Sequence, residues 1–165
     1  MIVRRAVPAD AAAMVAVQND IIRIGGTTAH ETPRTVAQVQ EDYITGDSVI
    51  SCQVAEEAGE LLGFQSVSLH PALPTGWGDI GSYVKSGLQR GGIGLALFKA
   101  TLAAVQAAGI TTINAAIRAD NAPGLGYYSR RGFVDYGQDP GFALQGGRVV
   151  GRALKRFDLT PHQFD

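Results

Sequence analysis

A glycine-rich run at residues 89–94 carries the clearest chemical signal in this chain. It consists of Gln89, Arg90, Gly91, Gly92, Ile93 and Gly94. The run follows a predicted strand at residues 79–85 and opens a predicted helix at residues 92–108. Glycine lets main-chain N–H groups approach a ligand closely, and a helix N-terminus adds unpaired donors and partial positive charge. The run therefore predicts a cradle for a phosphate or pyrophosphate. A glycine loop that only turns the chain into the helix is the alternative.

A second motif lies beyond the helix that the glycine run opens. Its fixed positions are Asn121, Tyr128, Gly132 and Phe133. Residues 121–131 are predicted to form a short helix that Gly132 ends. The Lys and Ser/Thr that follow the glycines of a P-loop are missing after Gly94, which argues against a nucleotide-binding module of that kind.

The composition is that of an ordinary globular domain, and we expect residues 1–165 to form one. Apolar residues make up 45% of the chain and charged residues 18%. Lys and Arg number 14 against 15 Asp and Glu, so the formal net charge is −1. This balance does not predict binding to nucleic acid or to an anionic membrane.

Cys52 is the single cysteine, which excludes an intrachain disulfide and a cysteine-cluster metal site. Its neighbours Ile50 and Val54 are expected on the same strand face, so a buried thiol is favoured over a reactive one. The three histidines show no metal-ligand spacing, and we expect no metal. No signal peptide and no transmembrane run is recognisable, and a cytoplasmic location is expected.

Hydrophobic periodicity predicts the order β-α-α-β-β-β-α-β-α-β-β. Strands are expected at residues 2–5, 49–56, 61–70, 79–85, 111–117, 133–136 and 149–159. Helices are expected at residues 11–24, 35–44, 92–108 and 121–131. The order indicates an α/β (α+β) fold, a mixed sheet of about seven strands flanked by about four helices.

The element order and both motifs resemble the GNAT superfamily of N-acetyltransferases over nearly the whole chain. The resemblance implies a mostly antiparallel sheet and acetyl-CoA as co-substrate, with its pyrophosphate held by the N–H groups of the glycine run. It further implies that Val84 contacts the thioester and pantetheine region and that Asn121 meets the pantetheine arm. The cofactor-binding residues implied are Val84, Gln89, Arg90, Gly91, Gly92, Ile93, Gly94, Leu95 and Asn121.

Three segments resemble the phosphinothricin acetyltransferase group, which acetylates small amino-acid-like amines. They are residues 27–33, 79–84 and 151–159. Two positions depart from that group: Asp79 stands where it has Glu, and many members have His where Tyr128 stands. The resemblance implies an amino acid or analogue as acceptor, a homodimer, and His30, Glu31 and Tyr83 as substrate-binding residues.

Acyl transfer from a thioester to an amine needs a proton acceptor, an oxyanion donor and a proton near the sulfur. Asp79 is the candidate base through a water; a solvated strand-end carboxylate is the alternative. The resemblance makes Tyr128 the candidate acid near sulfur; a core tyrosine is the alternative. The backbone N–H of Val84 is the expected oxyanion donor. His30 and Glu31 are either amine-pocket residues or loop surface.

Two further functions stay open at this point. One is acetylation of a protein N-terminus or lysine, although the near-neutral charge indicates no acidic groove for a cationic protein substrate. The other is a non-catalytic acyl-CoA sensor, which would be favoured by loss of Tyr128 or of the glycine run. Both are present.

Overall fold

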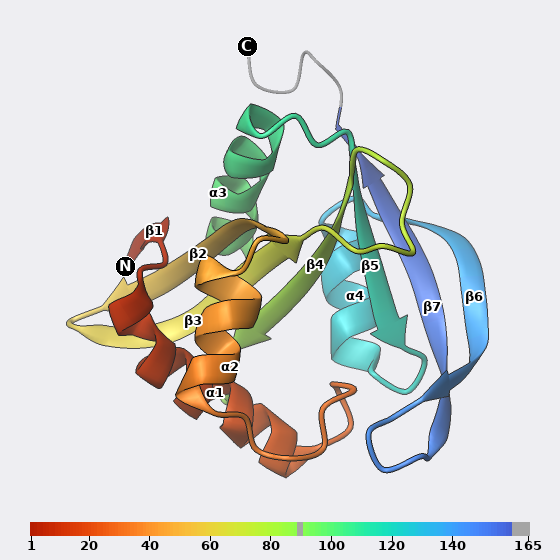
Figure 1. Ribbon diagram of the computed structural model, residues 1–165, viewed down its shortest axis with the longest axis horizontal. Helices are drawn as coiled ribbons and strands as arrows, with labels where there is room; N and C mark the ends of the chain where they lie inside the picture. Colours follow the sequence, from red (N-terminus) through yellow and green to blue (C-terminus); the bar gives the residue numbers. More distant parts are fainter. Residues whose placement is uncertain (89–90, 160–165) are drawn as a thin grey trace.

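Seven strands form one sheet in the computed structural model, which describes residues 1–88 and 91–159 (Figure 1). The strands are β1 (Ile2–Arg5), β2 (Val49–Glu57), β3 (Glu60–Ser68), β4 (Trp77–Val84), β5 (Thr112–Arg118), β6 (Val134–Ala143) and β7 (Val149–Asp158). Their order in the sheet is β1-β2-β3-β4-β5-β7-β6, and only β4 and β5 pair in parallel. The mixed, mostly antiparallel sheet is confirmed.

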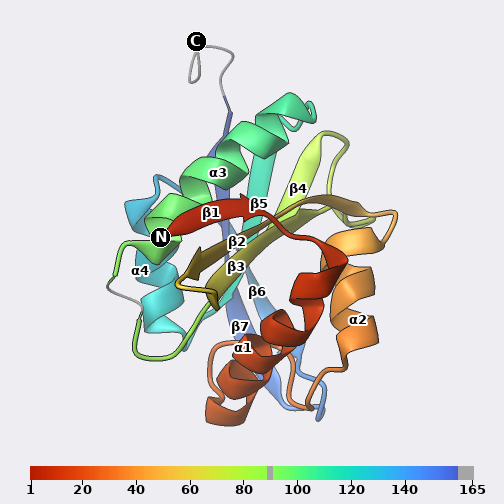
Figure 2. The same cartoon turned by 90° about the vertical axis from the view of Figure 1, so that its left-hand side faces the viewer.

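Four α-helices cover the two faces of this sheet. They are α1 (Ala11–Ile24), α2 (Val36–Gln40), α3 (Ile93–Ala107) and α4 (Ala122–Arg130). Figure 2 shows α1 and α2 on one face and α3 and α4 on the other. The 3-10 turn η1 (Pro8–Asp10) precedes α1, and α2 continues as the π-helical turn η2 (Glu41–Thr45), which completes the helix predicted at residues 35–44. Thr35 caps α2, because its side chain accepts the N–H of Gln38.

Apolar side chains are buried on both sides of the sheet. Met14 and Phe64 are buried beneath α1 and α2, and Phe98 and Ile113 are buried on the α3 side. Cys52 belongs to the core beneath α1 and α2, where burial raises the pKa of its thiol to about 12 and keeps it protonated. The buried thiol is confirmed.

The expectation that Ile50 shares a face with Cys52 and Val54 is wrong. The pairing of β2 with β3 shifts between Val49 and Ser51, and Ile50 packs against the core on the α3 side. An extra residue in one strand breaks the alternation of faces, which a sequence pattern does not reveal.

β4 and β5 part soon after they begin. Their parallel pairing covers Trp77–Thr112, Gly78–Ile113 and Asp79–Asn114. Beyond Asp79, β4 runs on to Val84 beside β3, while β5 runs to Arg118 beside β7. Figure 1 shows the two arrows diverging. The two strands therefore splay, and this opens the sheet next to the glycine run.

β6 is longer than residues 133–136, where the sequence placed it. Gly137 and Pro140 read locally as strand breakers, yet β6 pairs with β7 through two register shifts, and such irregular places tolerate these residues. The tip of this hairpin meets the loop after α1, since Gln145 Oε1 accepts the backbone N–H of Thr32 at 3.0 Å. Among the described residues, no helix is both long enough and apolar enough to cross a membrane.

Candidate active site

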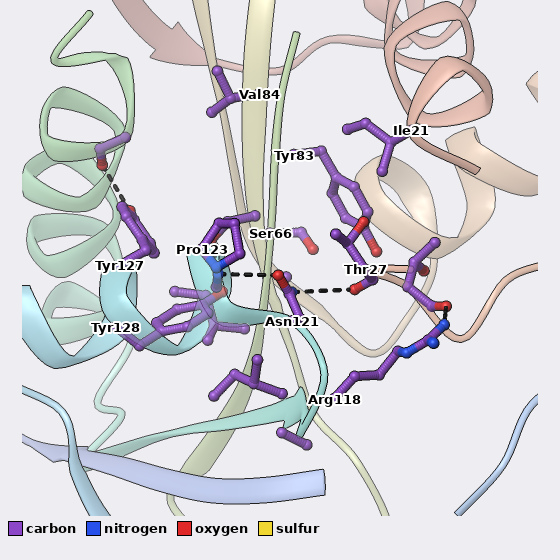
Figure 3. A pocket seen from close by; sticks show the side chains of 18 of the residues that line it. Ile21, Thr27, Ser66, Tyr83, Val84, Arg118, Asn121, Pro123, Tyr127 and Tyr128 are labelled. Carbon is purple, nitrogen blue, oxygen red and sulfur yellow. Dashed lines mark hydrogen bonds between the residues drawn. The ribbon is translucent and has the colours of Figure 1, made fainter. Parts of the chain in front are cut away.

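A cavity of about 1210 Å³ occupies the place where β4 and β5 separate (Figure 3). Its walls come from these two strands, the first turn of α3, α4 and the loop after α1. Of the predicted site residues it collects His30, Asp79, Tyr83, Val84, Gly92, Gly94, Leu95, Asn121 and Tyr128. Residues distant in sequence thus meet at one opening in the sheet.

Three predicted residues lie elsewhere. Glu31 is exposed, and its carboxylate accepts the N–H of Gly146 at 2.6 Å, so its placement in the amine pocket is corrected: it ties the loop after α1 to the β6–β7 hairpin. The side chain of Ile93 is buried in a core with Leu62 and Leu97, and the N–H of Gly91 donates to the carbonyl of Leu88. Gln89 and Arg90 lie outside the described residues.

Gly92 and Gly94, the two glycines of the run that line the cavity, are required for different reasons. Gly92 precedes α3 with φ +77°, a left-handed conformation that strains any residue with a Cβ. A Cβ on Gly94 would instead lie 2.6 Å from Cε2 of Tyr127. The Tyr127 hydroxyl donates to the carbonyl of Gly94 at 2.7 Å and accepts from Gln65 Nε2 at 3.0 Å. Gly94 therefore lets α4 close against the start of α3.

Tyr128 is at once a core residue and a wall of the cavity. Its hydroxyl lies 2.8 Å from Ser82 Oγ on β4, and its ring packs edge-on against Tyr127 and Phe133. Burial raises the pKa of Tyr128, so the phenol is neutral and its O–H remains available to donate. The two interpretations of this tyrosine do not exclude each other.

Asp79 is the last residue of β4 before the splay. Its Oδ1 accepts from Asn114 Nδ2 at 2.9 Å, and the Tyr136 hydroxyl donates to Asn114 Oδ1, which orients the amide. Burial raises the pKa of Asp79, while the Asn114 hydrogen bond and the nearby His70 and Arg152 act in the opposite direction. The carboxyl group is thus shielded and held, unlike the freely solvated strand-end carboxylate of the alternative.

Asn121 and Arg118 anchor the loop after α1 over the cavity. Asn121 caps α4 through Gly124 N–H at 3.0 Å and donates to the carbonyl of Thr27 at 3.4 Å. Arg118 is buried, pairs with Asp120, and donates from Nη1 to the carbonyl of Thr28 at 3.1 Å. Figure 3 shows both side chains reaching the loop. Arg118 was missed because a lone arginine at a strand end has no spacing signature.

His30 and Tyr83 line the wall formed by this loop and β4. His30 Nε2 lies 3.2 Å from Arg34 Nη1, and because a guanidinium only donates, Nε2 accepts and Nδ1 carries the proton. Burial, aided by the Arg34 charge, lowers the pKa of His30 and favours its neutral form. The Tyr83 ring stacks on Phe64 with 4.9 Å between centroids.

Basic residues lie beside the glycine run. Arg130 and Arg131 line the cavity, and the Arg131 guanidinium lies over the Tyr127 ring. Lys155 and Arg156 are instead engaged with Asp135 and Asp158. A left-handed glycine at a helix start, two diverging strand edges and adjacent cations fit a pyrophosphate with an extended amide-bearing arm, which is the shape of acetyl-CoA. Among residues 1–88 and 91–159, no group of three potential ligands is placed to hold a metal ion.

Fold and site together define an acetyl-CoA-dependent acyltransferase. Residues 18–133 match the acetyltransferase (GNAT) family, and the chain belongs to this family. It is an N-acetyltransferase with acetyl-CoA as co-substrate.

Comparison with individual proteins agrees with this assignment. The chain is 29% identical over 167 residues to an L-methionine sulfoximine/L-methionine sulfone acetyltransferase of Pseudomonas aeruginosa, covering 96% of this chain and 95% of that protein. It is similar in fold to a phosphinothricin acetyltransferase of Sinorhizobium meliloti in complex with acetyl-CoA, with a TM-score of 0.82, 22% identity, and coverage of 96% and 88%. A putative phosphinothricin N-acetyltransferase gives a TM-score of 0.81, 24% identity, and coverage of 96% and 98%.

Proposed function

We propose that this enzyme acetylates the primary amine of a free amino acid or amino-acid analogue by direct attack in a ternary complex. The observation that carries the proposal is the meeting of a shielded carboxyl group, Asp79, and a buried neutral phenol, Tyr128, in one cavity at the splay. The name of the Pseudomonas relative supports the amino-acid part.

When bound, acetyl-CoA supplies the acetyl thioester. The N–H groups at the start of α3 hold the pyrophosphate, Asn121 and the free edges of β4 and β5 receive the pantetheine arm, and the N–H of Val84 donates to the thioester carbonyl oxygen. Tyr128 donates its proton to the leaving sulfur as the C–S bond breaks, and the proton that the newly acylated nitrogen loses restores the phenol. Arg130 or Arg131 meets the nucleotide phosphate.

Asp79 takes the ammonium proton through water. Val84 follows Asp79 by five positions, which is about 16 Å along a strand at about 3.3 Å per residue. The β3–β4 pairing runs without a register shift from Gly63–Val84 to Ser68–Asp79, so β4 contains no bulge that would shorten this span. A water relay therefore remains as the route between acceptor and carboxylate.

The loop after α1 lines the acceptor end of the cavity, and this favours a small molecule over a protein substrate. The loop after α1 is tied down by Asn121 and Arg118, which leaves less room for an extended peptide than an open groove would. A ribosomal-protein-alanine N-acetyltransferase of Brucella melitensis shares the fold at 22% identity, which says nothing about this acceptor. The proposal also includes a cytoplasmic location and a homodimer, the latter tested by sedimentation.

Release of free CoA thiol, measured against a panel of amines, tests the proposed function. The panel contains methionine sulfoximine, methionine sulfone, phosphinothricin, the common amino acids, aminoglycosides and short peptides. Turnover confined to amino acids and their analogues is expected. Preference for a peptide N-terminus or lysine would overturn the substrate class, and absence of thiol release with every amine would overturn the function.

A further inference from the structure

Arg152 stands on the cavity wall with donor capacity that the described protein does not use. It lies on β7, directly opposite Arg118 on β5, and both side chains line the cavity. The Arg118 guanidinium donates to the carboxylate of Asp120 and to the carbonyl of Thr28. The Arg152 Nε is buried and has no hydrogen-bond partner among the described residues. A buried N–H without a partner is unfavourable, so this group calls for an acceptor.

The Arg152 side chain is also held in place before any ligand arrives. Its Nη2 donates to Asp139 at 2.9 Å, and its guanidinium carbon lies 3.6 Å from the centroid of the Phe142 ring. Stacking on one face and an ion pair at one edge fix the plane of the guanidinium. A planar group fixed in this way is suited to a carboxylate, which it can bind with two parallel hydrogen bonds.

The other arginines of the cavity are placed for other tasks. Arg130 is the last residue of α4 and Arg131 follows it, and the Arg131 guanidinium lies over the Tyr127 ring. Asp79, by contrast, lines the same cavity as Arg152, and the charge of Arg152 lowers the pKa of Asp79. The cavity thus presents a carboxylate for an ammonium group and a guanidinium for an anion, the two ends of a zwitterion.

We propose that Arg152 binds the α-carboxylate of the acceptor and makes the enzyme selective for amino acids over simple amines. This inference rests on the proposed function. It assigns the charge-bearing part of the substrate to a residue of β7, while Asp79 and Tyr128 act on its amine and on the thioester.

The test compares each amino acid that the enzyme acetylates with its α-amide, which keeps the amine and lacks the negative charge. In the Arg152→Gln variant, we expect KM for the amino acid to rise at least about tenfold, as for loss of a hydrogen bond to a charged group. KM for the amide should change by less than about twofold, and kcat for either by less than about threefold. In Arg152→Lys, KM for the amino acid should lie between the wild-type and Arg152→Gln values. Lysine keeps the positive charge but cannot form two parallel hydrogen bonds to a carboxylate.

Arg156→Gln is the matched control. Arg156 lies on the same strand, pairs with Asp158 and stacks over the Trp77 ring, yet it does not line the cavity. It should leave both KM values as in the wild type, and circular dichroism should show both variants folded. Equal losses for acid and amide, or a wild-type KM for the acid in Arg152→Gln, would overturn the inference while leaving the acetyltransferase intact. Acetylation of amines only when they lack a carboxylate would also overturn it.

Discussion

Replacing Gly94 by alanine tests whether the first turn of α3 is shaped by its contact with Tyr127. The added Cβ would lie 2.6 Å from the Tyr127 ring, a separation that forces something to move. The ring is not free to step aside, because its hydroxyl is bonded both to the carbonyl of Gly94 and to the buried amide of Gln65. Either the ring breaks these bonds or the glycine run shifts.

The size of the effect follows from these two routes. Overpacking of this kind costs about 1–3 kcal/mol. In the first route the clash stays in the free protein, and the free energy of unfolding falls. In the second route the glycine run shifts to relieve the clash, and the protein then binds acetyl-CoA more weakly. If the second route dominates, Kd rises roughly 5- to 150-fold. If the first dominates, Tm falls by about 2–4 °C for each kcal/mol in a domain of this size.

Calorimetric titration with acetyl-CoA and thermal unfolding measure the two losses, and their sum is the quantity to compare with about 1–3 kcal/mol. Gly91→Ala is the control, since a Cβ there meets its nearest atom, the Leu88 carbonyl oxygen, at an ordinary 3.4 Å. Wild-type affinity and stability in Gly94→Ala would refute the reasoning. So would an equal impairment in Gly91→Ala.

Three further substitutions test the chemistry. Tyr128→Phe should lower kcat by roughly 10- to 10⁴-fold with little change in acetyl-CoA affinity, and unchanged turnover when chemistry limits the rate would make Tyr128 a core residue only. Asp79→Asn should lose most activity at neutral pH and regain part of it at high pH, where more of the amine is neutral; wild-type activity at every pH would contradict this. Because burial raises the pKa of Asp79, the folded state favours its uncharged form, so the same variant should melt at pH 7 no lower than the wild type. Asn114→Leu should move the acidic limb of kcat/KM to higher pH, because the lost hydrogen bond lets the pKa of Asp79 rise further; an unmoved limb would show that Asp79 does not limit the rate there.

Local patterns were sufficient to predict most of the fold. Alternating apolar residues marked β2, β3 and β5, and the 3.6-residue period marked α1 and α3. The second half of β6 was not predicted, because Gly137 and Pro140 indicate a turn locally. The hydrogen bonds to β7 that hold this part as a strand are long-range interactions. The bulge at Ile50 was not predicted either, because it depends on the long-range pairing of β2 with β3.

The site was predictable where chemistry follows spacing along the chain. Gly92 and Asn121 belong to short motifs, and both line the cavity. Gln65, Arg118 and Arg152 were not predicted as site residues, since each acts through partners that only the folded sheet brings near. For Glu31 the sequence left amine pocket and loop surface open, because a position in a loop does not show which way the loop turns; the structure shows it exposed and bonded to Gly146.

The parting of β4 from β5 divides the sheet into two blocks, β1–β4 and β5–β7, which the strand ladder joins through three residue pairs in the described chain. A ligand arm that hydrogen-bonds to both edges acts as a missing strand between them. We therefore expect bound acetyl-CoA to resist separation of the two blocks. In that case the co-substrate would make the unfolding of the whole sheet more cooperative than it is in the free protein.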